Sequence, residues 1–177
     1  MNQHGELTAK IGRSLKFEGY NVFYDHGTPS ENVGNIVSTL EEKYGREDEL
    51  SQLDIAIVEK SPDLKDRAVV LVEIEVTSDR PKTILGDIFG VLFGEHVFFK
   101  RKELQVREFT TLIVVGISQV EHRVRNQQLQ NRANGIKEKL ETQNARIGKV
   151  VIKTYRNEDD LSTELPSLLE RVVMGDR

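Results

Sequence analysis

The feature that most constrains this fold is the run at residues 69–76, which reads VVLVEIEV. Its β-branched and apolar residues, with no Gly or Pro, predict a β-strand, and a run this apolar is typical of a central strand covered on both faces. The strand nevertheless carries Glu73 and Glu75 near its end. Residues i and i+2 of a strand point to the same face, so we expect the two carboxylates about 6–7 Å apart.

Two like charges on a largely buried surface are costly unless a cation or a proton intervenes. The strand can end at this point and leave both carboxylates in water. They can instead bind a divalent metal ion, or one of them can form a buried ion pair with a lysine from another part of the chain. The strand by itself leaves these three alternatives open.

Composition narrows the class of protein. The length of 177 residues predicts a single domain over residues 1–177. The chain has no cysteine, which excludes a disulfide framework, a thiolate zinc site and a cysteine nucleophile. Polar residues follow Met1, and no apolar run approaches the roughly 18 residues of a membrane span. We therefore expect a cytoplasmic protein with no membrane contact.

The net charge of −4 hides an asymmetry along the chain. Residues 1–95 hold 10 Lys/Arg and 18 Asp/Glu, a balance of −8, whereas residues 96–156 hold 13 and 5, a balance of +8. A basic block can bind nucleic acid locally even in an acidic protein. The same charges can also simply solvate helix faces.

Hydrophobic periodicity and turn residues predict the order of the elements. Helices are predicted at 5–18, 31–45, 81–93, 121–143 and 158–173, and strands at 20–24, 53–59, 69–76, 109–116 and 150–155. The helix at 31–45 is the weaker prediction because two glycines interrupt it, and we expect the acidic segment at about 27–52 to be a mobile insertion. This order predicts an α/β fold with a mixed central sheet flanked by helices.

The strands at 53–59 and 69–76 are joined by a short turn, which favours an antiparallel pair. Asp54 starts the first strand and Glu75 lies near the end of the second, so the two ends meet at one edge of the sheet. Asp54, Glu73 and Glu75 are therefore expected to converge. An oxygen-rich site of this kind suits Mg²⁺ or Mn²⁺ better than Zn²⁺. Without metal, clustered acids should share protons and have raised pKa values.

Two further residue patterns have simpler interpretations. Gly86, Gly90 and Gly94 recur every four residues and predict close packing of a helix against a neighbouring strand rather than a phosphate-binding loop. The four histidines are scattered, and we expect them to be surface or loop residues. Only His26 is expected near the mouth of the acidic site.

These elements resemble the PD-(D/E)XK nuclease superfamily, whose restriction-endonuclease-like core has the order αβββαβ. A helix with a glutamate in its first turn precedes a three-strand meander. The second strand begins Leu53-Asp54-Ile55 and the third reads Val-Glu-Ile-Glu-Val, before a helix and another hydrophobic strand. The likeness covers residues 5–116, and residues 117–177 would be a C-terminal α-β-α extension.

The resemblance implies roles for individual residues. Asp54 and Glu73 match the metal-binding acids of the motif, and Glu6 matches the helix glutamate that many members add to the metal site. Glu75 falls where the family usually has the lysine that positions or activates the attacking water. The resemblance therefore leaves that cation to Lys82, at the start of the next helix, or to Lys10.

The activity implied is that of a Mg²⁺- or Mn²⁺-dependent endonuclease that hydrolyses phosphodiester bonds, with DNA as the expected substrate. Glu75 would then act as general base or as a ligand of a second ion. The basic residues expected to contact phosphates are Lys100, Arg101, Lys102, Arg123 and Arg125, with Arg132 beside them. The thin apolar stripe of residues 121–143 can equally mark a homodimer interface.

The alternative is a non-catalytic module of the same fold that lost the lysine and binds nucleic acid or protein. An α/β protein unrelated to the superfamily is a third interpretation. The environment of Glu75 separates the first two: a working site needs the three acids close enough to share a metal with a cation nearby.

Overall fold

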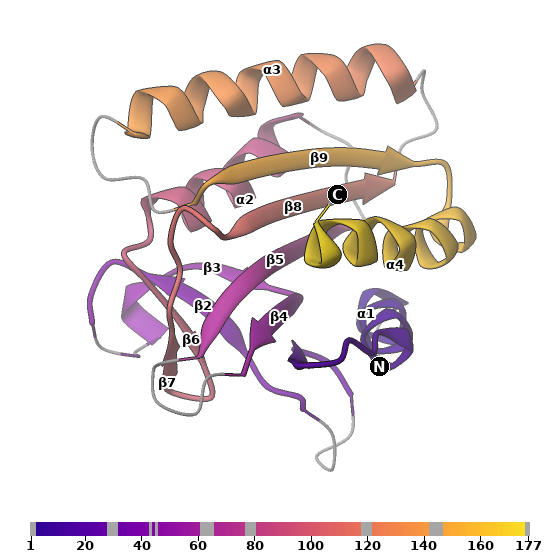
Figure 1. Cartoon of the computed structure of the whole chain (residues 1–177). Coiled ribbons are helices and arrows are strands. Elements are labelled where there is room, and N and C mark those ends of the chain that lie inside the picture. Colours follow the sequence, from indigo (N-terminus) through magenta and orange to yellow (C-terminus); the bar gives the residue numbers. More distant parts are fainter. Residues whose placement is uncertain are drawn as a thin grey trace.

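The computed structural model describes residues 3–27, 32–42, 44, 46–60, 66–76, 81–117, 122–141 and 147–175. Within these ranges the chain has a mixed α/β fold with two sheets and four α-helices (Figure 1). The predicted α/β class is therefore confirmed.

The bounds of the elements agree with the longer predictions. The helices are α1 (Gln3–Ser14), α2 (Pro81–Phe93), α3 (His122–Glu141) and α4 (Glu158–Met174), with a 3₁₀ turn η1 (Arg46–Asp48). The strands are β1 (Tyr20–Tyr24), β2 (Ile36–Thr39), β3 (Glu49–Leu53), β4 (Ile55–Glu59), β5 (Arg67–Glu75), β6 (His96–Phe99), β7 (Lys102–Leu104), β8 (Thr111–Ile117) and β9 (Lys149–Tyr155).

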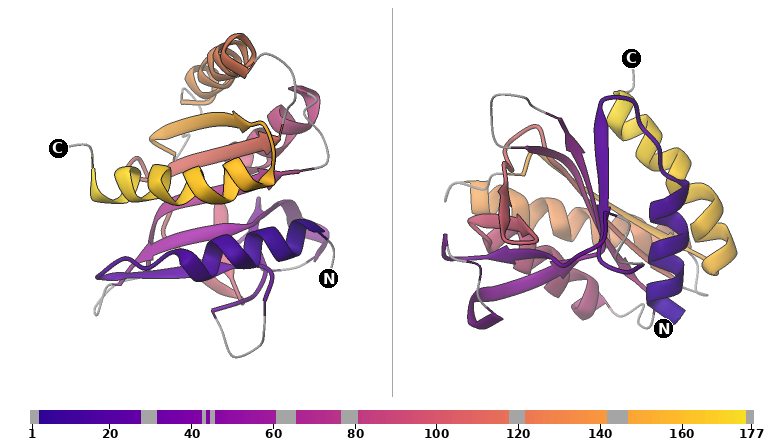
Figure 2. Two further views of the ribbon diagram at one scale, coloured as in Figure 1. Left: turned by 90° about the vertical axis from the view of Figure 1, so that its right-hand side faces the viewer. Right: turned by 90° about the horizontal axis from the view of Figure 1, so that it is seen from below.

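The main sheet has the strand order β1-β4-β5-β8-β9. β1, β4 and β5 pair antiparallel, whereas β5, β8 and β9 pair parallel, so the predicted mixed central sheet is confirmed. Helices α1 and α4 lie side by side over one face of this sheet, and α2 and α3 lie on the other side (Figure 2).

The alternation of side chains along β5 divides the core into two layers. Val70, Val72 and Ile74 pack under α1 and α4, while Leu71 packs toward α2 and α3. All four side chains are buried, which explains why β5 reads as an almost continuous apolar run. The residues of α4 that face the sheet are also fully buried. The C-terminal elements therefore complete the core rather than lying outside it.

The structure corrects the prediction at residues 31–45. The segment forms no helix in its described part: it contains β2, which pairs with β3 and β6 in a second sheet of order β3-β2-β6-β7. Val33, Ile36 and Val37 have spacing that mimics a helix, but every residue of β2 is buried because the strand is covered on both faces. Residues 28–31 of the predicted mobile insertion lie outside the described residues, so its mobility stays a prediction.

The main sheet and the second sheet meet at Asp54. Leu53 ends β3 and Ile55 begins β4, so the chain passes from one sheet to the other at this single residue. The backbone stays bonded through the junction, because Asp54 N donates to Val72 O at 2.9 Å and Asp54 O accepts from Asp25 N at 3.0 Å. The fold therefore fixes the backbone of Asp54 from both neighbouring strands.

The glycine row of α2 meets the second sheet, as predicted for part of the row. A Cβ at Gly90 would lie 2.7 Å from the backbone oxygen of Leu50 in β3, and a Cβ at Gly94, just after the helix, would collide with Ser38 of β2. The Ser38 hydroxyl donates to Gly90 O at 3.2 Å. A Cβ at Gly86, by contrast, would meet open space.

We expect opposite effects on stability from two Gly→Ala substitutions in α2. Gly90→Ala should lower the free energy of unfolding by about 1–3 kcal/mol, because its methyl group forces β3 away from the helix. Gly86→Ala should raise it by about 0.5–1 kcal/mol through helix propensity alone. Urea unfolding followed by circular dichroism measures both changes, and equal effects of the two variants would contradict the close packing at Gly90.

Candidate functional site

Two acids of the predicted site face each other across neighbouring strands. Ile55, the first residue of β4, pairs with Val72 of β5, and Asp54 and Glu73 each lie one residue beyond this pair. Asp54 N donates to Val72 O, one residue out of step with that pair, so the regular ladder ends at Asp54. The two acids are close enough for the charge of Asp54 to raise the pKa of Glu73, so the expected convergence of these two strand ends is found.

The carboxylate of Asp54 is buried and held from two sides. The residue is 2% exposed, and its Oδ2 accepts a hydrogen bond of 2.7 Å from the backbone N of Ile74. From α1, the Thr8 hydroxyl donates to Oδ1 at 3.3 Å, and His4 Nε2 lies 3.0 Å from the same oxygen. The side chain therefore has one orientation, with Oδ1 turned toward α1.

Glu73 lies in a strongly anionic environment. Burial raises the pKa of Glu73 to about 10, and the neighbouring carboxylates Asp54, Asp87, Asp25 and Glu75 add to the shift. Its Oε2 is buried and has no hydrogen-bond partner among the described residues. Glu73 is therefore protonated at neutral pH unless a cation takes the place of its proton.

Two acids outside the predicted site join this cluster. Burial raises the pKa of Asp87 to about 6, with further contributions from Glu75 and Asp54. Burial also raises the pKa of Asp25, as does Asp54, against the opposing effect of His26. The raised pKa expected for clustered acids is thus found at Glu73, Asp87 and Asp25. The sequence analysis missed Asp87, although a lone carboxylate in the apolar run of α2 was a signal that it could have used.

Two histidines also lie at the site. His4 is half-buried against Asp54 instead of standing on the open surface, and this contact raises its pKa while burial opposes the shift. His26 Nδ1 contacts Asp25 Oδ1, which agrees with the expectation that His26 lies near the mouth of the site. The sequence analysis did not place His4 at the site. The only sequence feature that could have done so is the spacing of four residues between His4 and Thr8, which puts both on one face of the helix.

The other predicted site residues lie as follows. Glu75 is half-buried on β5 and acts electrostatically on Glu73, Asp87 and His4. Glu6 is exposed, and the contacts of α1 with Asp54 come from other residues of the helix. Lys10 donates to Ser162 of α4. The side chain of Lys82 is outside the described part of the structure.

The predicted nucleic-acid contacts are divided between two places. Lys100 and Arg101 are exposed at the turn between β6 and β7, and Lys102 pairs with Asp66 at 2.7 Å. The side chains of Arg123 and Arg125 lie outside the described residues. Arg132 is exposed on α3, whose apolar residues Leu129 and Ile136 pack into the core of the same chain. These two residues of the stripe are therefore not available to a partner.

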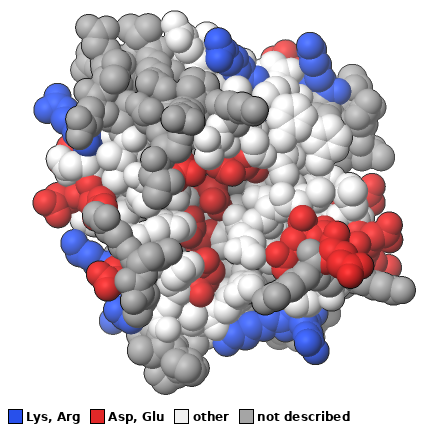
Figure 3. Space-filling view, turned by 180° about the vertical axis from the view of Figure 1, so that it is seen from behind, with Lys and Arg blue, Asp and Glu red and all other residues white. Residues whose placement is uncertain are grey.

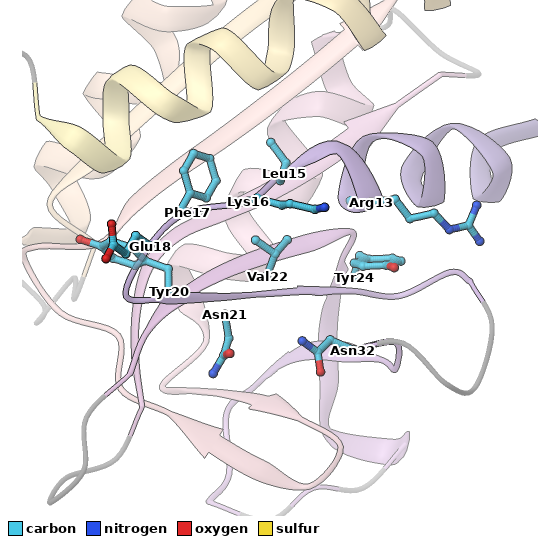
Figure 4. Close-up of a pocket in the computed structure, with 11 residues that line it drawn as sticks. Arg13, Leu15, Lys16, Phe17, Glu18, Tyr20, Asn21, Val22, Tyr24 and Asn32 are labelled. Carbon is cyan, nitrogen blue, oxygen red and sulfur yellow. The ribbon is translucent and has the colours of Figure 1, made fainter.

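The surface view shows where the charges gather. Figure 3 shows acidic side chains in a band near the centre of one face, with Lys and Arg mainly at its periphery. A hollow of about 680 Å³ lies elsewhere, between the end of α1 and β1. Figure 4 shows Leu15, Lys16 and Phe17 on one side of β1 and Asn21 on the other. The acids of the cluster do not line this hollow, so we do not assign it to the same site.

Comparison with protein families, with curated proteins and with solved structures finds no match for this chain. No helix among the described residues has the length and apolarity needed to cross a membrane.

The donor set fits a divalent cation. The cluster offers carboxylate oxygens and imidazole nitrogens from α1, β5, α2 and the ends of β1 and β3. One oxygen of Glu73 and one of Asp87 are buried without a hydrogen-bond partner in the described structure. Buried carboxylates without partners are costly, and a cation bound between them removes both the repulsion and the need for protons.

We expect Glu73→Gln to stabilise the metal-free protein at alkaline pH. The folded pKa is about 10 and the unfolded value 4.5, so folding takes up a proton between these values. The stability of the wild type therefore falls as pH rises through this window. Glutamine imitates the protonated acid, and its advantage should grow from near zero at pH 5 to about 1–3 kcal/mol near pH 9.

Urea unfolding with a chelator present, at pH 5.5 and pH 8.5, measures this difference. Glu59→Gln is the matched control, since Glu59 stands on the neighbouring strand β4 and pairs with Arg67 at the surface. A Glu73→Gln advantage that does not change with pH would show that Glu73 is ionised in the folded protein.

Proposed function

We propose that this protein is a metal-dependent nuclease that hydrolyses phosphodiester bonds in DNA with Mg²⁺ or Mn²⁺. The observation that carries the proposal is the closeness of Asp54 and Glu73 at the junction of β4 with β5, where neighbouring acids raise the pKa of Glu73. Buried carboxylates that repel one another destabilise the fold, and a bound cation would remove that repulsion.

The arrangement of the elements supports the restriction-endonuclease-like interpretation. Reading only the main sheet and its first two helices, the order is α1-β1-β4-β5-α2-β8. This order corresponds to the αβββαβ core implied by the resemblance. The second sheet is then an insertion between β1 and β4, with a further hairpin between α2 and β8.

Asp54 and Glu73 are the residues that would hold the ion. A bound Mg²⁺ or Mn²⁺ supplies charge neutralisation at the scissile phosphate and lowers the pKa of a water molecule. Asp54 is suited to this position because Ile74 N and Thr8 fix its carboxylate. Glu73 adds a second negative charge to that of Asp54 only after it has lost its proton.

The family lysine is replaced by Glu75, so proton transfer and positive charge must come from other residues. Asp87, with a pKa of about 6, is ionised at neutral pH and is a stronger base than an ordinary carboxylate, which suits it to accept the proton of the attacking water. His4 has a raised pKa beside Asp54 and provides positive charge at the site. Both residues are supplied by helices that pack on opposite faces of the sheet.

The function can be tested by measuring metal binding and cleavage on the same samples. Titration calorimetry with Mg²⁺ and Mn²⁺ should show binding to the wild type, and binding should be lost in Asp54→Asn and weakened in Glu73→Gln. A plasmid-nicking assay should show cleavage that depends on the metal, with a reduction of at least about 100-fold in Asp54→Asn. Glu59→Gln should behave as wild type in both measurements.

Each outcome distinguishes the two functions. Metal binding that requires Asp54, accompanied by nicking, establishes the nuclease. If the wild type binds DNA in a gel-shift assay but neither binds metal nor nicks it, the protein is a non-catalytic binding module. Nicking that survives in Asp54→Asn contradicts the assignment of the site.

The turn between β6 and β7 is a second test of the DNA interaction. Lys100 and Arg101 have φ values of 48° and 68°, a conformation that costs about 1 kcal/mol per non-glycine residue and that two-residue hairpin turns usually give to Asn-Gly. We expect Lys100→Asn with Arg101→Gly to raise the free energy of unfolding by about 1–2 kcal/mol and to weaken DNA binding. Filter binding at several salt concentrations should show a shallower salt dependence, because phosphate contacts are lost. Unchanged binding would remove these two residues from the interface.

A further inference from the structure

A second set of metal-ligating atoms lies beside the Asp54–Glu73 pair. Asp25, His26 and Asp54 each offer one ligand atom, and these three atoms lie within 4.8 Å of one another. Donors of one ion, each about 2.1 Å from it, are separated by no more than about 4.2 Å. Small side-chain movements therefore close this set around a cation.

The fold brings these three residues together at the junction of the two sheets. Asp25 and His26 directly follow β1, and Asp25 N is bonded to Asp54 O, which continues the pairing of β1 with β4 by one residue. His26 Nδ1 contacts Asp25 Oδ1. The two loop residues are thus attached to the buried carboxylate through the backbone as well as through their side chains.

Helix α1 has a space shaped for the ring of His26. A Cβ at Gly5 would collide with Cδ2 of His26, so the ring packs directly against the helix backbone where only glycine leaves room. Glycine lowers helix stability by about 0.5–1 kcal/mol relative to alanine. Gly5 therefore lowers the stability of the helix but leaves the space that holds the His26 ring in one place.

His4 extends the set on the side of α1. Its ring centroid lies 5.7 Å from that of His26. Its Nε2 is 3.0 Å from Asp54 Oδ1 and is a buried nitrogen without a hydrogen bond aligned on any described partner. A second imidazole nitrogen therefore stands at the same oxygen of Asp54.

We propose that Asp25, His26 and Asp54 bind a divalent transition-metal ion, for which Mn²⁺ is the probe, and that His26 makes the site discriminate against Mg²⁺. Imidazole nitrogen is a good ligand for transition metals, whereas Mg²⁺ strongly prefers oxygen and keeps its water. Asp54 is shared with Glu73, so the inference rests on the proposed function and defines which metal the same centre takes.

The preference can be measured without any activity assay. The electron paramagnetic resonance signal of free Mn²⁺ decreases as the ion binds, and Mg²⁺ added in competition reports the relative affinity. We expect the wild type to bind Mn²⁺ at least about tenfold more tightly than Mg²⁺. His26→Gln should weaken Mn²⁺ binding by about tenfold or more while changing Mg²⁺ binding by less than about twofold.

Gly5→Ala tests the placement of the ring with the ligands intact. It should weaken Mn²⁺ binding by about tenfold, because the added methyl group displaces the ring of His26. Urea unfolding checks that the variant is folded. Gly86→Ala is the matched glycine control, since a Cβ there meets open space. His96→Gln is the matched histidine control, since His96 pairs with Glu103 in the second sheet. Both controls should bind Mn²⁺ as the wild type does.

The outcomes separate this inference from the proposed function. Mn²⁺ binding that depends on His26 supports the inference even if no DNA is cleaved, in which case the nuclease proposal alone fails. Equal binding of Mn²⁺ by the wild type and by both His26→Gln and Gly5→Ala overturns the inference, even if nicking still requires Asp54. Equal affinity of the wild type for Mn²⁺ and Mg²⁺ overturns it as well.

Discussion

The structure of the site depends on one hydrogen bond, from the backbone N of Ile74 to Asp54 Oδ2 at 2.7 Å. Asp54 interrupts a strand that would otherwise run from the second sheet into the main one, and its side chain takes a backbone donor of β5 at the point where the two sheets separate. The residue thereby satisfies a donor of the fold with one oxygen and leaves the other facing α1. A neutral side chain here would keep the bend but lose the negative charge around which the other groups are placed.

The other acids of the cluster lower the stability of the fold, and the burial of apolar side chains in the two core layers compensates for this loss. Carboxylates on a face with little access to water repel one another, and the folded protein accommodates them by leaving Glu73 protonated at neutral pH. The surrounding strands tolerate this because their other side chains are almost all fully buried. Stability sacrificed at one end of the sheet is characteristic of binding sites, where the compensating charge comes from a ligand.

The predictable part of this site comes from short-range rules. Alternation along β5 places Glu73 and Glu75 on one face, and the short connection to β4 makes an antiparallel pair that brings Asp54 to the same end of the sheet. The second sheet could not be predicted in this way, because one partner of β2, the strand β6, lies far along the chain and the four residues of β2 show no alternation of burial. The same holds for Asp87 and His4, which reach the cluster only because α2 and α1 pack against the main sheet.

The two histidines at the site can supply the positive charge that a lysine would supply at the position of Glu75. A lysine on β5 would bring a fixed positive charge into the acidic cluster, whereas Glu75 adds a further negative one. The positive charge then has to come from groups that gain or lose it, namely the imidazoles of His4 and His26 and a bound ion. Imidazole can be a cation beside Asp54 or a neutral ligand of a metal, but not both at once. Protons and metal ions therefore compete for the same side chains at this centre. Low pH favours the protonated imidazoles, and higher pH favours the bound metal ion.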